Sequence, residues 1–265
     1  MYNVVKYSNW MNELRFNTFD KMDSDFLFTL CATIKNCHSE VIEIPFSYLK
    51  KAVHYPQNSN SLNSQFVQDL RRMNKKLLGI QCEMKGRRGV IVTFNLFSTF
   101  MIDAERKTLT VRVNPDFAFV LNDLVSEYTK FELDQFISLK SKYSKELYKQ
   151  LKQWRKAGTA YFPVDELRIA MNCPEKYTMS QFMQKILQPA VKELKDKQCF
   201  KRLTLTQIHA KKKGAPVTGC RFTWVKELHE DIAVEDTWND EGLTALDRDT
   251  SLFTADDFYI EEKGA

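Results

Sequence analysis

The sequence predicts a mixed α+β fold in which one helix-plus-hairpin module is built twice. Residues 64–68 read Ser-Gln-Phe-Val-Gln, and residues 180–184 read Ser-Gln-Phe-Met-Gln. Each copy opens a stretch with helical apolar spacing, follows a strand-like segment that ends in proline, and precedes two β-rich segments around a Gly/Lys/Arg turn. Because both the string and the order of elements repeat, two related domains are expected.

Composition supports two domains of ordinary size. The chain has 265 residues, of which 43% are hydrophobic, so two small cores are possible. We expect an N-terminal domain at 1–130, a C-terminal domain at 131–228 and an acidic, disordered tail at 229–265. No long apolar run or signal pattern is present, which predicts a cytoplasmic protein without a membrane segment.

The first module begins with a helix over residues 21–36. Its apolar residues recur every three or four positions, and aspartates crowd its start, where the helix dipole favours negative charge. A second long helix opens at Ser64 and should end at Gly79, a typical C-cap residue. The other expected elements are a strand at 41–45, a helix at 47–53, hairpins at 80–94 and 97–113, and a helix at 117–128.

The second module is expected to open with the longest helix of the chain. Apolar residues keep helical steps from Phe136 to Trp154, and Gly158 should stop the helix. A strand at 161–162 and a helix starting at Pro163 follow. Thr178 and Gln181 fit a capping box at the start of the next helix, which Pro189 should kink or loosen. Strands at 200–209 and 219–225 form the last hairpin.

Charge is distributed very unevenly. Residues 1–130 hold 17 Lys/Arg against 13 Asp/Glu, residues 131–226 hold 20 against 8, and residues 227–265 hold 2 against 13. A strongly basic domain beside an acidic tail favours a polyanionic partner. The alternative is a lysine-rich surface that is merely solvated.

The predicted order of helix, strand, helix, helix and hairpin is that of a winged helix, whose third helix fits the major groove of DNA. In the second module, the outward residues near the start of this helix can bond to base edges, since Gln pairs with adenine and Lys with guanine. Ordinary solvated polar residues are the alternative. The candidate base readers are Thr178, Ser180, Gln181, Gln184, Lys185 and Gln188.

Backbone contacts are expected from clustered cations, which give affinity and salt dependence rather than sequence choice. In the second module these cations are on the tip of the last hairpin and on the long helix. In the first module they are on the Ser64 helix and the hairpin that follows it. The candidates are Lys211, Lys212, Lys213, Lys145, Arg71, Arg72, Lys75, Lys76, Arg87 and Arg88.

Several strings resemble the iteron-binding replication initiators of theta-replicating plasmids. They run in family order and cover roughly residues 12–226. The strings are Phe-Val-Gln-Asp-Leu-Arg-Arg-Met-Asn-Lys-Lys-Leu-Leu at 66–78, Phe-Asn-Leu-Phe at 94–97, Thr-Leu-Thr-Val-Arg-Val-Asn-Pro at 108–115, Leu-Lys-Gln-Trp-Arg at 151–155 and Ile-Leu-Gln-Pro-Ala-Val-Lys-Glu-Leu at 186–194.

The resemblance implies two winged-helix domains, of which the C-terminal one reads bases through residues 178–194, with Ser180, Gln181, Gln184 and Lys185 as readers. It implies that monomers bind direct repeats, called iterons, at a plasmid origin and help to open the duplex, with host replication proteins as further partners. It also implies a homodimer, joined mainly through the N-terminal domain, that represses the initiator's own gene in equilibrium with the monomer.

Other classes are less well supported. A winged-helix repressor without initiator activity shares the DNA chemistry but seldom needs two such modules. A rolling-circle nicking enzyme needs a His-x-His pair, and the four histidines are isolated; no phosphate-binding loop is present either, so no enzyme is expected. The six cysteines lack metal-site spacing, so no metal or cofactor is expected. A further hypothesis is that the acidic tail mimics DNA and covers the basic domain.

Overall fold

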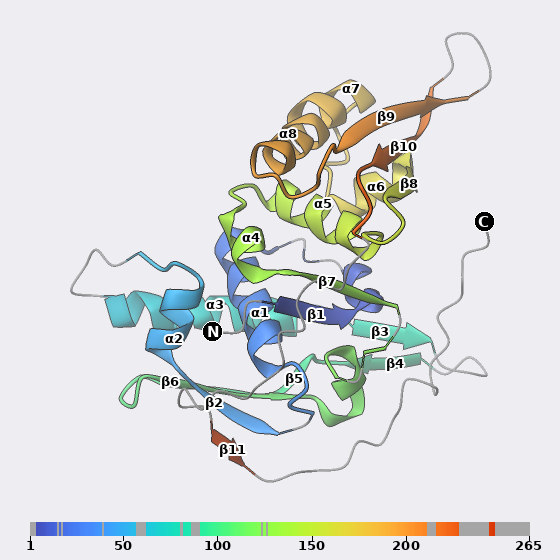
Figure 1. Ribbon diagram of the computed structural model, residues 1–265. Helices are drawn as coiled ribbons and strands as arrows, with labels where there is room; N and C mark the ends of the chain where they lie inside the picture. The colour runs from blue at the N-terminus through green and yellow to red at the C-terminus, as the bar shows by residue number, and fades with distance from the viewer. Residues whose placement is uncertain are drawn as a thin grey trace. The chain divides into compact units, whose positions relative to one another are not determined.

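The two halves of the chain share one order of helices and strands (Figure 1). The computed structural model describes residues 4–14, 16, 18–38, 40–56, 62–79, 82–85, 91–122, 124, 125, 127–210, 216–227 and 244–246. The described residues up to 128, with 244–246, form one unit, and those from 129 to 227 form the other. In each unit a helix, a strand, two helices and a hairpin follow one another, so the predicted α+β fold with two winged-helix domains is confirmed.

The winged helix of the first unit consists of three helices and a sheet. The sheet order is β11-β2-β6-β5, in which the paired residues Ile42 and Val111 both face the core. The elements are β1 (Val4–Ser8), a 3-10 turn (Asn9–Asn12), α1 (Lys21–Ile34), β2 (Val41–Pro45), α2 (Phe46–Ala52), α3 (Leu62–Leu78), β3 (Cys82–Lys85), β4 (Ile91–Phe94), β5 (Phe97–Asp103), β6 (Thr108–Val113), a 3-10 turn (Pro115–Val120) and β11 (Thr244–Leu246).

An aromatic cluster joins the helices of the first unit. The Phe66 ring of α3 lies 5.0 Å from Phe46 of α2, 5.0 Å from Tyr55 and 5.5 Å from Phe26 of α1. All four side chains are buried, and such aromatic contacts add to the apolar area removed from water. The cluster therefore fixes α3, the helix that corresponds to the DNA-reading helix of a winged helix.

The second unit repeats this plan around a sheet of order β8-β10-β9. Leu147 and Leu151 of α5 are completely buried, as are Phe182 and Leu194 from the third helix. The elements are β7 (Tyr128–Glu132), α4 (Leu133–Ser138), α5 (Lys142–Gln153), β8 (Thr159–Pro163), α6 (Val164–Ala170), α7 (Met179–Phe182), a π-helical turn (Met183–Leu187), α8 (Gln188–Asp196), β9 (Thr204–His209) and β10 (Val217–Thr223).

The longest predicted helix is in fact two helices. Its apolar periodicity continues across residues 139–141, but Leu139 is extended and Ser141 caps α5, its hydroxyl accepting a hydrogen bond from the Tyr143 amide at 3.1 Å. Serine is a favoured N-cap residue because its short side chain satisfies an amide of the first turn. Helical spacing alone therefore predicted a single helix where a cap separates two.

The helix predicted at 117–128 is also corrected. A 3-10 turn ends at Val120, and the side-chain amide of Asn122 then donates to the nearby Ala118 carbonyl at 2.5 Å, while its Oδ1 accepts a long-range hydrogen bond from the His38 amide at 2.8 Å. Asparagine side chains compete in this way with helical hydrogen bonds.

The acidic tail lies largely outside the described residues, so its expected disorder stays a prediction. Its described part, β11, pairs antiparallel with β2, with Ala245 opposite Ile42. No helix in the described part of the chain is long and apolar enough to cross a membrane.

Candidate nucleic-acid interface

A capping box fixes the start of the proposed reading helix in the second unit. The Thr178 hydroxyl accepts a hydrogen bond from the Gln181 amide at 3.2 Å, and Gln181 Oε1 accepts one from the Thr178 amide at 2.9 Å. Two helix-terminal donors are satisfied reciprocally. Two of the six candidate base readers thus also determine where the helix begins.

The other four candidates lie on the solvent side of this helix. The exposed side of the helix contains Ser180, Gln184, Lys185 and Gln188. Its buried side contains Phe182, Met183, Ile186 and Leu187. The exposed side is polar and cationic and contains no carboxylate between residues 176 and 192. Because amide side chains can pair with adenine and lysine can reach guanine, this face can read base edges in a major groove.

A π-helical turn lies in the middle of the exposed face, at Met183–Leu187. Gln188 and then Pro189 follow this turn, and Pro189 has no amide hydrogen to donate to the preceding turn. A π turn places one extra residue in the helix and so accommodates the proline. The predicted irregularity of the helix near Pro189 is therefore observed, in the turn that precedes the proline.

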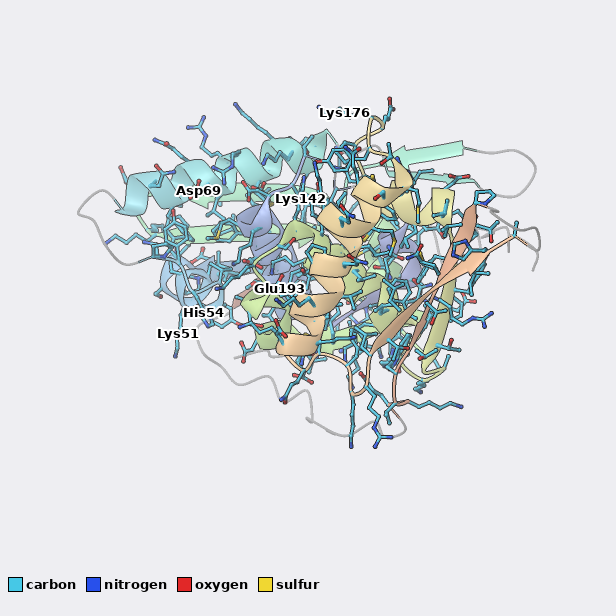
Figure 2. The ribbon with its side chains drawn as sticks, turned by 90° about the horizontal axis from the view of Figure 1, so that it is seen from above. Lys51, His54, Asp69, Lys142, Lys176 and Glu193 are labelled. Atoms are coloured by element: carbon cyan, nitrogen blue, oxygen red, sulfur yellow. The ribbon has the colours of Figure 1, made fainter. Side chains whose placement is uncertain are left out.

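Glu193 on α8 holds the helix to the start of α5. Its carboxylate accepts hydrogen bonds from the Lys140 amide at 2.6 Å and the Ser141 amide at 3.3 Å. Figure 2 labels Glu193 on α8 and Lys142 at the first residue of α5. Partial burial acts to raise the pKa of Glu193, but hydrogen bonds from Ser144 and the two amides, with the charge of Lys145, outweigh it and lower the pKa.

Arg168 on α6 holds the loop that precedes the capping box. Its guanidinium donates to the Tyr177 carbonyl at 2.6 Å and lies 5.5 Å from the centre of the buried Phe182 ring. Neither Arg168 nor Glu193 was predicted from the sequence, because their partners are not fixed by helical spacing. Both are positioning residues for the exposed face.

The prediction that Lys145 contacts the DNA backbone is wrong. Its side chain is buried, its ammonium donates to the Phe136 carbonyl at 2.5 Å, and it lies 4.0 Å from the centre of the Phe136 ring. Two other lysines of α5 are also buried, Lys149 beside Glu146 and Lys152 beside Glu227. A buried, bonded ammonium cannot reach a phosphate, so these lysines stabilise the unit instead.

In the first unit, α3 carries cations in two different environments. Arg72 donates to Asp69 at 2.7 Å and lies 3.6 Å from Asp23, and Lys76 pairs with Asp23. Figure 2 labels Asp69 on this helix. Partial burial acts to raise the pKa of Asp20, but the Asp23 amide and the charges of Lys76 and Arg72 hold it below its ordinary value. These ion pairs tie α3 to the start of α1.

The other two cations of α3, Arg71 and Lys75, are exposed. They line one side of a cavity of 590 Å³ beside Gln68, which is also exposed. The cavity is lined by Thr18, Gln68, Arg71, Arg72, Lys75, Lys76 and Gly79. Arg71 and Lys75 can attract phosphate groups to this hollow, whereas Arg72 and Lys76 are already paired with carboxylates. Arg87, Arg88, Lys211, Lys212 and Lys213 lie outside the described residues.

Comparison with known proteins agrees with this geometry. The family model described as "Initiator Replication protein, WH1" matches residues 4–152, more than half of the chain. The chain belongs to the initiator replication protein family. The model described as "Initiator Rep protein, WH2" matches residues 163–224 of the same chain. The first matched segment covers the first winged helix and continues into α4 and α5, and the second covers the rest of the second winged helix of this initiator-family protein.

One curated protein and one solved structure are similar to this family member. It is 33% identical over 192 residues to the "Probable replication protein rep" of Bifidobacterium longum (strain NCC 2705), covering 72% of this chain and 64% of that protein. The chain thus spans less than two thirds of that relative's length. The crystal structure of Pi initiator protein in complex with iteron DNA has the same fold, with a TM-score of 0.66 at 15% identity, covering 86% of this chain and 99% of that one.

Proposed function

We propose that this protein initiates plasmid DNA replication by binding iteron repeats at the origin and promoting duplex opening. The observation that carries the proposal is the exposed row Ser180, Gln184, Lys185 and Gln188, held on a capped and anchored helix. The 33%-identical relative is named a probable replication protein, and the structurally similar Pi initiator was crystallised with iteron DNA. Family membership supports the same role here.

In this proposal the second unit reads the bases. Thr178 and Gln181 also face the groove while they cap the helix, and Lys211–Lys213, which lie in the sequence between β9 and β10, bind phosphates. The first unit adds backbone contacts through α3 and joins the homodimer, which represses the protein's own gene. The protein works in the cytoplasm by binding alone, without enzymatic chemistry, and hands the open origin to host replication proteins.

The first experiment compares origin duplex with shuffled duplex of equal length across a salt series. Specific recognition predicts a preference of about a thousandfold or more. Gln184→Ala should cost about 1–3 kcal/mol on the origin duplex and little on the shuffled one. Lys156→Ala, an exposed change in the same unit but outside the reading helix, is the control and should leave the preference ratio unchanged.

A winged-helix repressor without initiator activity is the second candidate, since it would use the same reading helix. The two differ in strand opening. On a supercoiled origin plasmid, an initiator should make thymines near the repeats reactive to permanganate, whereas a repressor should bind the repeats and leave them unreactive. Binding without opening would therefore replace the initiator proposal with the repressor.

A further inference from the structure

The sheet of the second unit has an outer face that the reading helix does not use. Alternate residues of its strands are buried against the core, among them Ala160, Cys220 and Phe222. Because successive residues of a strand point to opposite sides, the residues between them face outward. Six of these outward residues are exposed, namely Thr159 and Tyr161 on β8, Arg221 and Thr223 on β10, and Thr204 and Thr206 on β9, whereas Gly219 is buried and its partners Pro163 and Ile208 are half-buried.

The Tyr161 ring lies directly on the backbone of Gly219. A Cβ atom at Gly219 would stand 2.5 Å from the ring atom Cε2 and 2.5 Å from the phenol Oη, so a larger residue at this position would force the Tyr161 side chain to shift. Tyr161 is nevertheless 48% exposed. It is therefore supported on one side by the sheet and open to solvent on the other.

A cationic residue lies beside Tyr161 in the sheet. Arg221 is paired with Tyr161 across the strands, and Thr206 is paired with Arg221 on the other side. Residues 197–226, which include β9 and β10, contain eight Lys/Arg and no Asp/Glu. An aromatic ring in such a stretch is suited to a ligand that carries both negative charge and flat rings.

We propose that this outer face, defined by Tyr161, Gly219, Arg221 and Thr206, binds single-stranded DNA. Unpaired bases stack on exposed aromatic side chains, and arginine binds their phosphates, whereas the bases of a duplex are already stacked on one another. The inference rests on the proposed function, because duplex opening produces single strands beside the bound protein. It adds a second DNA surface that shares no residue with the reading helix.

The test uses the full chain and a fluorescein-labelled oligothymidylate of about 20 nucleotides, long enough for one such binding surface. Tyr161→Ala should weaken binding of this probe roughly tenfold or more, and Tyr161→Phe should bind like the parent because the stacking face is retained. Trp154→Ala removes another aromatic side chain of the same unit, 46% exposed, and should have no effect on the probe. Binding of the origin duplex should be unchanged in all three.

Unchanged binding of oligothymidylate by Tyr161→Ala would overturn the inference and would leave the Tyr161 ring with only a packing role against Gly219. Equal losses on single strand and duplex would also overturn it, because they would indicate a general loss of charge or fold. If Tyr161→Ala is unstable, binding of oligothymidylate by Arg221→Gln is the second test, because this change leaves the Tyr161–Gly219 contact in place. A parent protein that ignores the origin duplex but binds oligothymidylate would instead refute the proposed function alone.

Discussion

Replacing Lys145 with methionine tests whether this lysine stabilises the second unit or binds DNA. The ammonium is bonded to the Phe136 carbonyl and lies over the Phe136 ring, and the residue is 2% exposed. Methionine fills nearly the same space with an unbranched side chain, so the change removes the charge and the hydrogen bond without opening a large cavity. The carbonyl of Phe136 loses this partner.

The expected cost follows from these contacts. A hydrogen bond from a charged donor contributes about 1.5–3 kcal/mol, and a cation over a desolvated ring up to about 2 kcal/mol. Part of this loss of stability is offset in Lys145→Met, because a neutral side chain is buried without the cost of removing a charge from water. We therefore expect Lys145→Met to destabilise the unit by about 1–3 kcal/mol, and Lys145→Ala by more, since alanine adds a cavity.

Urea unfolding followed by circular dichroism measures this cost, and the salt dependence of duplex binding measures any phosphate contact. Lys142→Met is the matched control, because Lys142 is exposed on the same helix. Lys145→Met should lower stability and leave the salt slope unchanged. If stability is unchanged and the slope falls by about 0.9, the value for one lost phosphate contact, then Lys145 reaches DNA and our reasoning is refuted.

Three further outcomes are expected. Leu147→Ala, at a completely buried position, should destabilise the second unit by about 2–5 kcal/mol in thermal unfolding, and an unchanged melting temperature would show that this helix face is not core. Glu193→Gln should be less stable than the parent near neutral pH. Because the folded-state pKa of Glu193 is lowered, this difference should begin to shrink as pH falls below about 4.3 and disappear below the folded-state pKa; a difference that stays constant throughout the acid range would contradict it. Arg71→Ala with Lys75→Ala should weaken binding to all duplexes and flatten the salt slope, whereas Arg72→Ala should mainly lower stability; identical effects would show that the ion pairs of Arg72 do not matter.

Much of the fold followed from local patterns. Gly79 follows α3 directly, its amide bonded to the carbonyls of Lys75 and Lys76, as its C-cap position predicted. The capping box at Thr178 and the effect of Pro189 were also predictable, because each depends on residues within one turn of itself. The base-reader set stays a prediction, although its four outward members are indeed exposed.

The sequence by itself determined the repeated module, the winged-helix order and the basic character of the second unit. These properties are carried by periodicity, caps and charge, which act between near neighbours in the chain. Only the tertiary structure decided that Lys145 is buried, that Glu193 anchors the reading helix 53 residues from Lys140, and that Tyr161 lies on Gly219. Burial and long-range bonds depend on which surfaces meet after folding, and no local pattern specifies that.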